Sequence, residues 1–259
     1  MPPAALQVSV VQRKALPVRL VPKDRTVWLL SDTHIHPAEW FNIDDDVELL
    51  SATLRWTPAD DQVVLLCDVT ESMLAFTAEW FARALLAQPK TRELLDLINR
   101  RKRLRVVLGN HDLRISGMLS DLFGNDRVCI GPIALHRLLL LHGHEVSWLF
   151  QGFPGWLGRG AIPVLNPVER FARRVTGWHI ERLIPDGNLD AAIDLLRLEA
   201  GLAFAVYGHR HRPGINGRVA NTGCFLRTTR RTLIRVTNNE VVLLQVSKPE
   251  PPTPKEHAK

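Results

Sequence analysis

Residues 26–34, TVWLLSDTH, contain the feature that decides the fold: a short apolar run that ends in a polar block. Thr26 to Ser31 is rich in Val and Leu, as expected of a strand that is buried on both faces. Asp32 and His34 follow this run at once. The same pattern recurs in two further runs, Gln62 to Cys67 (QVVLLC) and Leu104 to Leu108 (LRVVL).

Helical periods separate these runs. Apolar residues recur on one stripe in three segments: Asp44 to Trp56, Glu71 to Ala87 and Thr91 to Arg101. Short apolar strands that alternate with amphipathic helices are typical of βαβ crossover units. The first half of the chain therefore predicts an α/β fold with a largely parallel sheet.

The second half of the chain has shorter elements. Val128 to Leu141 predicts two strands around a turn at Gly131 and Pro132. Leu189 to Leu198 predicts a helix, and Ala203 to Tyr207 predicts another buried strand. A terminal antiparallel meander is expected from four short runs: Gly217 to Ala220, Phe225 to Thr229, Thr232 to Val236 and Glu240 to Val246.

Composition limits the class of protein. The 259 residues are 46% hydrophobic and 23% charged, which suits one catalytic-sized globular domain and excludes a disordered or collagen-like chain. The net charge of +6 favours anionic partners such as nucleotides, lipid headgroups or phosphorylated molecules. The 3 cysteines form no CxxC pair, so we expect a reducing, cytoplasmic location. We expect neither a secretory signal nor a transmembrane helix.

We expect four regions along the chain. Residues 1–25 are a basic N-terminal extension, residues 26–246 form the catalytic domain, and residues 247–259 form a disordered tail. Within the domain, residues 147–184 are rich in aromatic and basic residues and resemble an insertion.

Five polar blocks follow the ends of the predicted buried strands. They are Asp32-Thr33-His34, Asp68 with Glu71, Gly109-Asn110-His111-Asp112, His142-Gly143-His144 and Gly208-His209-Arg210-His211. In open α/β sheets, ligands bind at this edge. A lone histidine there is usually a surface or hydrogen-bonded residue, but five blocks in order favour a metal site. Carboxylate, imidazole and amide donors suit manganese, iron, zinc or cobalt.

The order of these blocks, DxH, GDxx(D/E), GNH(D/E), HG and GHxH, resembles the calcineurin-like metallophosphoesterases, with Cys67 at the position of the usual glycine. Asn221-Thr222-Gly223 is similar to the Asn-Pro-Gly turn that often follows GHxH in that family. The resemblance implies a four-layer αββα sandwich, in which residues 147–184 would form a helical cap, and a dinuclear metal centre at the strand ends.

The resemblance also implies a ligand set. It assigns Asp32, His34 and His211 to one divalent metal ion and Asn110, His142 and His209 to the other, with Asp68 as the bridge between them. The two cations, manganese in the first instance with iron, zinc or cobalt as alternatives, would share a hydroxide that attacks phosphorus.

Further residues take roles around this centre. His111 would donate a hydrogen bond to the phosphate or act as a general acid. Glu71 would orient it, with Asp112 as the rival for that role. Asn110 would also face the substrate, and Arg210 either contacts a substrate phosphate or faces solvent. Three remaining residues are expected to have no direct role in catalysis. Cys67 is expected to be a packing residue, and His36 and His144 are expected to be surface or supporting histidines.

The spacing of the blocks suggests a subfamily. The longest gap falls between His142 and His209, a layout that resembles the UDP-2,3-diacylglucosamine hydrolases, in which an insertion caps the site and receives acyl chains. Aromatic and arginine residues in residues 147–184 suit a lipid-linked substrate and peripheral contact with a membrane. The competing interpretation is a helical hairpin packed on the core. The chain departs from those enzymes in having His111 and His144 where they carry Arg and Asp.

The function predicted from these features is metal-dependent hydrolysis of a phosphoester or pyrophosphate bond, on a nucleotide-linked, lipid-linked or other phosphorylated substrate. A nuclease or a protein phosphatase is the alternative. Nucleic acid is disfavoured, because no basic run with interleaved aromatics lies outside the insertion. A vestigial scaffold is disfavoured because all seven inferred ligands are present. The sequence leaves the oligomeric state open.

Overall fold

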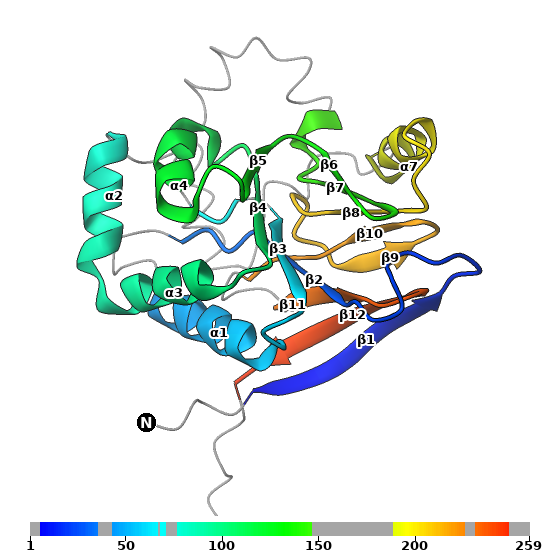
Figure 1. Cartoon of the computed structure of the whole chain (residues 1–259), viewed down its shortest axis with the longest axis horizontal. Helices are drawn as coiled ribbons and strands as arrows, with labels where there is room; N and C mark the ends of the chain where they lie inside the picture. Colours follow the sequence, from blue (N-terminus) through cyan, green and yellow to red (C-terminus); the bar gives the residue numbers. More distant parts are fainter. Residues whose placement is uncertain are drawn as a thin grey trace, which may run out of the picture.

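Two β-sheets pack face to face, and helices cover the outer face of each sheet (Figure 1). A computed structural model of the chain describes residues 6–35, 43–66, 68–70, 77–146, 189–225 and 231–248. The predicted insertion at residues 147–184, the tail beyond Lys248 and the side chains of His36, Cys67 and Glu71 lie outside these ranges.

The larger sheet has seven strands in the order β1-β12-β11-β2-β3-β4-β5. Its strands are β1 (Gln7–Ala15), β2 (Val27–Ser31), β3 (Gln62–Leu66), β4 (Leu104–Leu108), β5 (Val128–Ile130), β11 (Thr232–Val236) and β12 (Glu240–Ser247). Strands β2 to β5 are parallel, which confirms the crossover units predicted for this part of the chain. The β1, β12 and β11 side of the sheet is antiparallel.

The smaller sheet has five strands in the order β6-β7-β8-β10-β9. Its strands are β6 (Ile133–Leu135), β7 (Leu138–Leu141), β8 (Phe204–Tyr207), β9 (Gly214–Asn216) and β10 (Val219–Asn221). Strands β7, β8 and β10 run parallel, and the two edge strands are antiparallel to their neighbours. The carboxyl ends of β7 and β8 therefore lie at one edge of this sheet.

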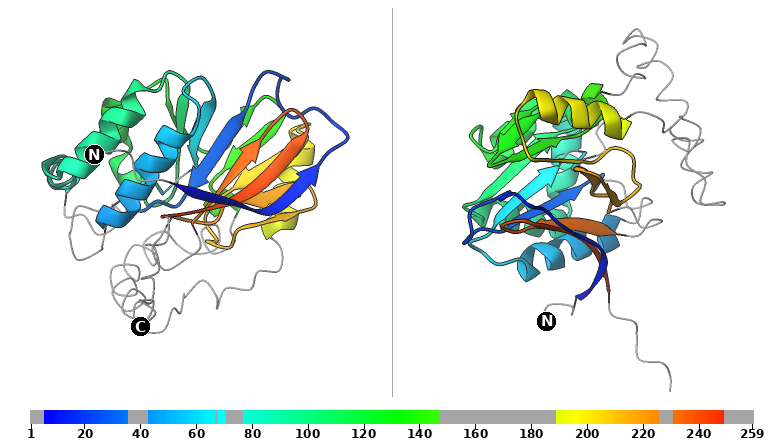
Figure 2. Two further views of the ribbon diagram at one scale, coloured as in Figure 1. Left: turned by 90° about the horizontal axis from the view of Figure 1, so that it is seen from below. Right: turned by 90° about the vertical axis from the view of Figure 1, so that its right-hand side faces the viewer.

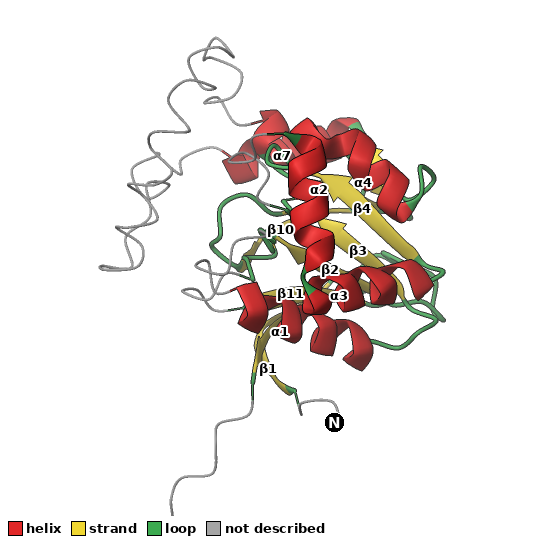
Figure 3. Ribbon diagram, turned by 90° about the vertical axis from the view of Figure 1, so that its left-hand side faces the viewer, coloured by secondary structure: helices red, strands yellow, loops and turns green. Residues whose placement is uncertain are grey.

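Helices cover the outer face of the larger sheet. They are α1 (Ile43–Trp56), α2 (Ala78–Ala87), α3 (Pro89–Arg100) and α4 (Ser116–Phe123), and Figure 3 shows them on one side of the yellow strands. Helices α1, α2 and α3 lie in segments where an apolar stripe predicts a helix. Helix α7 (Leu189–Glu199) covers the smaller sheet, and the right view in Figure 2 places it on the side of the molecule opposite to α1. The described residues thus form the four layers that the sequence predicts.

Three apolar clusters hold these layers together. One lies between the two sheets and joins Leu29 and Leu66 of the larger sheet to Leu140 and Phe204 of the smaller one. A second packs the outer face of the larger sheet against α1 to α4, and a third packs Ile193 of α7 on the smaller sheet. Burial on both faces explains why these strands read as continuous apolar runs.

Two predictions about short strands are wrong. The segment 128–141 forms three strands, and Gly131, at φ +81°, lies between β5 in the larger sheet and β6 in the smaller. The C-terminal segment is also not one meander, because β10 pairs in parallel with β8 while β11 and β12 form a hairpin in the larger sheet. Local patterns fail here because strands of three residues carry no signal for the sheet they join.

The N-terminal segment contributes a strand that the sequence analysis did not identify. The composition of residues 1–25 predicts a basic extension. In the structure, Gln7–Ala15 of this segment forms β1 at the edge of the larger sheet and pairs with β12 along its length. Most of β1 is exposed, so its sequence lacks the apolar alternation of a half-buried strand. The side-chain amide of Gln12 also bonds the backbone of Ile215 in β9, which ties the two sheet edges together.

Among the helices of the described ranges, none combines the length and the hydropathy that a transmembrane span requires.

A pair of leucine substitutions tests the four-layer packing. Leu29→Ala opens a cavity between the two sheets, where Leu29 is fully buried. We expect a loss of about 2–5 kcal/mol in the free energy of unfolding, measured by urea denaturation. Leu195→Ala on the outer face of α7, where the side chain is 61% exposed, is the matched control and should change that energy by less than about 0.5 kcal/mol. Equal losses in the two variants would contradict the packing.

Candidate metal centre

Five loops bring the predicted ligands to one edge of the sandwich. Asp32 and His34 follow β2, Asp68 follows β3, and Asn110 with His111 follows β4. The smaller sheet contributes His142 after β7 and the loop 208–211 after β8. Because β2 to β4 are parallel to one another, and β7 is parallel to β8, the loops of each sheet emerge side by side.

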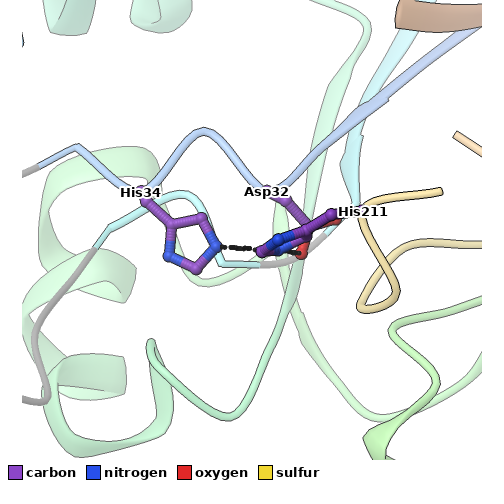
Figure 4. A group of neighbouring side chains, drawn as sticks. All are labelled: Asp32, His34 and His211. Atoms are coloured by element: carbon purple, nitrogen blue, oxygen red, sulfur yellow. Dashed lines mark hydrogen bonds and ion pairs between the residues drawn. The ribbon is translucent and has the colours of Figure 1, made fainter. Parts of the chain in front are cut away.

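One group of donor atoms consists of Asp32, His34 and His211 (Figure 4). Nε2 of His211 lies 3.2 Å from Oδ1 of Asp32, and Nε2 of His34 lies 3.9 Å from the same oxygen. The two imidazole nitrogens face each other at 3.3 Å. Two facing imidazole nitrogens need a proton or a cation between their lone pairs.

A second group forms around His142, which is fully buried. Its Nε2 lies 3.1 Å from Oδ2 of Asp68, 2.9 Å from Oδ1 of Asn110 and 3.1 Å from Nδ1 of His209. Asp32, Asp68 and His142 also present one donor atom each within 4.8 Å of one another. The two groups are therefore neighbours, with the carboxylates between them.

The spacing of these atoms fits divalent cations. Metal–ligand bonds of about 2.0–2.2 Å place neighbouring ligand atoms about 3.0 Å apart in octahedral and about 3.4 Å apart in tetrahedral geometry. Four of the separations described above, at 2.9, 3.1, 3.2 and 3.3 Å, lie close to these values. The mixture of carboxylate, imidazole and amide donors suits borderline transition metals.

The backbone is strained where the ligands sit. Six non-glycine residues of the described ranges have positive φ, and five of them are predicted ligands: Asp32, His34, Asp68, His209 and His211. Each such residue costs on the order of 1–3 kcal/mol and persists only where its surroundings enforce it. Strain of this kind gathers at functional sites, so its concentration in these loops independently supports the predicted ligand set.

Two glycines leave room for the carboxylates. A Cβ at Gly109 would lie 2.0 Å from Oδ1 of Asp68, and a Cβ at Gly208 would lie 2.5 Å from Oδ2 of Asp32. Neither glycine has positive φ, so each is required by close approach and not by its own conformation. These two positions explain why glycine opens the third and the fifth polar block.

The surroundings favour the cation-binding forms of Asp32, Asp68 and His209. Burial raises the pKa of Asp32, but the hydrogen bond and charge of His211 outweigh burial and leave this pKa below its ordinary value. Burial acts on Asp68 in the same way, yet the charges of His142 and His111 bring its pKa well below the usual range. Burial lowers the pKa of His209 strongly. For His142, burial lowers the pKa, but the charge and hydrogen bond of Asp68 outweigh burial and raise this pKa above its ordinary value. Ionised carboxylates and a neutral imidazole are the forms that ligate metals.

Asp112 has a supporting position. It is fully buried and accepts hydrogen bonds from the backbone N–H groups of Val69, Thr70 and Gly109 and from the hydroxyl of Thr70. Burial and the nearby charge of Asp68 raise the pKa of Asp112 to about 6. These contacts tie the loop after β3 to the loop after β4, so they hold Asp68 and Asn110 in place. Orientation of His111 by Asp112 or Glu71 stays a prediction.

The side chain of His111 is more exposed than those of His34 and His142, which also lie near Asp68. Its backbone N–H donates to Oδ1 of Asp68 at 2.9 Å, and its Nε2 lies 3.8 Å from Oδ2. The ring meets that of His34 edge to face, with centroids 4.9 Å apart, and 18% of its side chain is exposed. His111 therefore stands at the rim of the centre, where a bound molecule could reach it.

Residues Gly208-His209-Arg210-His211 form the GHRH loop, in which Arg210 contacts a different carboxylate from its two histidine neighbours. His209 donates its backbone N–H to both oxygens of Asp32, and His211 contacts Asp32 through its ring. Arg210 instead lies 4.0 Å from the carboxylate of Asp190 in α7. Its predicted contact with a substrate phosphate stays a prediction.

Residues that the sequence analysis missed connect the two sheets beneath the ligands. The hydroxyl of Ser31 bonds that of Thr222 and the carbonyl of Gly223. Asn221 donates to the carbonyl of Gly208 at 2.6 Å, which holds the GHRH loop. The sequence signal for this link is Ser31, a polar residue that ends an apolar strand immediately before Asp32. Asn221-Thr222-Gly223 by itself predicts only a turn.

Glu145 was also missed. Its carboxylate accepts the backbone N–H groups of His142 and Gly143 and lies 3.4 Å from Nδ1 of His144. These hydrogen bonds fix the conformation of the loop after β7. Burial lowers the pKa of the His144 ring, and a supporting role for His144 stays a prediction. The signal was the position of Glu145 directly after His142-Gly143-His144.

The fold and the two donor groups define a metal-dependent phosphoesterase. The family model of the calcineurin-like phosphoesterases matches residues 25–213, and the chain belongs to that family. The match confirms the resemblance carried by the five polar blocks. Members of the family use divalent metals, which agrees with the donor groups described above. No curated protein matches the chain.

The chain is similar to several solved structures at low sequence identity. A predicted phosphoesterase from Streptococcus pneumoniae is 15% identical, with 83% of this chain and 82% of that chain covered and a TM-score of 0.41. A cold-active protein-tyrosine phosphatase from Shewanella is 15% identical, with 87% and 80% covered and a TM-score of 0.45. Vacuolar protein sorting 29 from Cryptosporidium parvum is 15% identical, with 86% and 95% covered and a TM-score of 0.41. Likenesses this remote say nothing about substrate.

Glycine substitutions test how the centre is built. Gly109→Ala and Gly208→Ala each push a methyl group into a carboxylate that ligation requires. We expect metal affinity to fall about 10- to 100-fold, measured by metal analysis after dialysis against defined free metal. Gly117→Ala in α4, where a Cβ meets nothing within 4 Å, is the control and should keep full metal content. Unchanged metal content in the first two variants would sink the close-approach argument.

Proposed function

We propose that this protein hydrolyses a phosphoester or pyrophosphate bond with two divalent cations, one held by Asp32, His34 and His211 and the other by Asn110, His142 and His209. Asp68 bridges them. The observation that carries the proposal is the overlap of the candidate donor groups: Asp32 belongs both to the group with His34 and His211 and to the group with Asp68 and His142. When bound, the cations supply positive charge for the phosphoryl oxygens and activate the attacking water.

The residues of the chain divide the remaining work. Asp68 and Asp32, ionised and buried, keep the site negative enough to retain cations. Asn110 offers a neutral oxygen next to His142. His111, at the exposed rim, donates a hydrogen bond to the phosphate or a proton to the leaving oxygen. Manganese is the first candidate metal, with iron, zinc and cobalt as the alternatives.

The substrate class rests on the layout of the chain. The long gap between His142 and His209 favours a nucleotide-linked or lipid-linked phosphate, with residues 147–184 as the element that receives it and that touches a membrane surface. A cytoplasmic location fits that role. Those residues lie outside the described ranges, so the assay must distinguish the substrates.

A panel of three substrates tests the proposal. Full-length protein supplied with manganese should hydrolyse at least one of a chromogenic phosphomonoester, a chromogenic phosphodiester and a UDP-linked pyrophosphate. Activity should disappear on addition of EDTA and return with excess metal. Asp68→Ala should lose both metal and turnover, because it removes the shared ligand. Full activity in metal-free protein would refute the mechanism.

Substitution of His111 separates metal binding from proton transfer. His111→Ala should retain its metal content, since all seven predicted ligands remain although His111 lies close to His34 and Asp68, while kcat falls about 10²- to 10⁴-fold. The loss should be steepest for esters with poor leaving groups, because these need a proton most. Metal analysis and kcat for a series of aryl phosphates measure both effects. Equal losses across the series would argue against His111 as the proton donor.

A further inference from the structure

A run of basic residues lies at the amino end of β4, opposite to the metal centre. Residues 97–111 contain no Asp or Glu, and residues 100–103 (RRKR), which form the basic run, lie between the last turn of α3 and β4. The predicted ligand Asn110 follows the other end of β4. At about 3.3 Å per residue, the distance along the strand from the basic run to the ligand loop is about 20 Å. The basic run is therefore remote from the metal centre.

One cation of the basic run has a structural role. Arg101 is buried, and its guanidinium donates to the carbonyls of Leu54, Thr57 and Pro58 at the carboxyl end of α1. The last carbonyls of a helix lack partners within the helix, so Arg101 completes this end of α1. Its charge is directed into the protein and is not offered to a ligand.

The other three cations of the basic run face solvent. Arg100, Lys102 and Arg103 are exposed. Within the described ranges their side chains make one hydrogen bond, from the guanidinium of Arg103 to the backbone carbonyl of Asp60 at 2.9 Å, and no ion pair. A backbone carbonyl carries no net charge, so this part of the surface offers positive charge to an anionic partner.

A further cation comes from the neighbouring strand. Arg103 directly precedes β4, Arg127 directly precedes β5, and these two strands pair in parallel. The side chain of Arg127 bonds the carbonyl of Asn99, the residue before Arg100, at 3.2 Å, and it makes no ion pair with the described residues. The segments on either side of β4 therefore extend one basic surface.

An aromatic ring from a distant part of the chain lies at the same end of the sheet. Trp56 ends α1 and precedes Thr57, whose carbonyl Arg101 bonds. Trp56 is 42% exposed, and its ring meets that of Trp28 edge to face, with centroids 5.1 Å apart. The indole N–H of Trp28 donates to Asp61 at 2.9 Å, which fixes the ring beneath Trp56. Trp56 thus offers a supported aromatic surface near the basic run.

This combination of groups suits a single-stranded nucleic acid. A guanidinium bonds two phosphate oxygens at once, and every nucleobase has a face that stacks on an aromatic ring. A membrane surface also attracts cations, but interfacial binding takes several apolar side chains in addition. Of the large hydrophobic residues that are exposed in the described ranges, only Trp56 lies in the contacting segments 54–61 and 99–105.

We propose that this surface binds the backbone of a single-stranded nucleic acid, with Arg100, Lys102 and Arg103 on phosphates and Trp56 stacked on a base. The sequence alone disfavours nucleic acid, because no aromatic residue interleaves a basic run outside residues 147–184. The fold supplies the aromatic residue from α1 instead. Binding here needs no metal, because the surface and the ligands lie at opposite ends of β4.

Fluorescence anisotropy with a labelled oligouridylate tests the proposal. Full-length protein is titrated at several salt concentrations in EDTA, which prevents hydrolysis at the metal centre. In Lys102→Gln/Arg103→Gln, binding at low salt should weaken about 10-fold, and the slope of log Kd against log salt should fall by about 1.4, because each lost phosphate contact removes about 0.7. Arg13→Gln/Arg83→Gln removes the same charge from β1 and α2 and should keep the wild-type values.

Trp56→Leu separates stacking from charge. Binding should weaken about 5- to 100-fold, because one base loses its stacking partner. The salt slope should not change, because no phosphate contact is removed. A duplex of the same length should bind the wild-type protein more weakly than the single strand, since its bases are already stacked. Urea denaturation checks that each variant is folded, and the charge variants decide the proposal even where Trp56→Leu is unfolded.

Three results would overturn the proposal. Unchanged affinity and salt slope in Lys102→Gln/Arg103→Gln would exclude the basic run as the binding surface. A duplex that binds as tightly as the single strand, to wild type and Trp56→Leu alike, would exclude the single strand as the ligand. Phosphatidylserine vesicles that bind wild-type protein more tightly than the oligonucleotide, and lose it in the double variant, would identify a membrane instead. Each result stands whether or not the protein hydrolyses phosphoesters, because EDTA is present throughout.

Discussion

The carboxylate of Asp32 is the group on which the rest of the centre depends. It is fully buried at the end of β2 in the larger sheet, yet it accepts the backbone N–H of His209 from the smaller sheet and contacts the ring of His211. An uncompensated charge in this position would be costly, so the two sheets can meet at this edge only when the donors are in place. The same contact that joins the sheets brings the two halves of the ligand set together.

Hydrogen bonds between neighbouring loops hold the predicted ligands in their strained backbone conformations. The loops after β2 and β3 run side by side, with the N–H groups of His34 and Ile35 bonded to the carbonyls of Asp68 and Val69. Asp112 ties in the loop after β4 through its four hydrogen bonds. Because every loop is bonded to its neighbour, residues with positive φ are retained where isolated loops would relax.

The GHRH loop contacts carboxylates from two elements. The backbone N–H of His209 and the ring of His211 contact Asp32, whereas Arg210 lies 4.0 Å from Asp190 of α7. The bond from Asn221 to the carbonyl of Gly208 lies at the base of this loop.

The sequence by itself determined the five polar blocks and their order. Each of the five blocks follows an apolar run, and both the run and the block are local features that neighbouring residues encode. The parallel half of the larger sheet and the helices α1, α3 and α7 were equally readable, because their periods extend over enough residues to be distinctive. The close positions of Asp32, Asp68 and His142 follow from the family pattern, which the match to residues 25–213 confirms.

Only the tertiary structure decided which partner each short or polar segment takes. The assignment of β5 and β6 to different sheets, the pairing of β10 with β8 and the recruitment of β1 depend on burial against residues far away in the chain. The same holds for the Ser31 to Thr222 link, the backbone partners of Asp112 and the direction of Arg210. A hydrogen bond between distant residues leaves no periodic trace in sequence, since either partner alone is compatible with many environments.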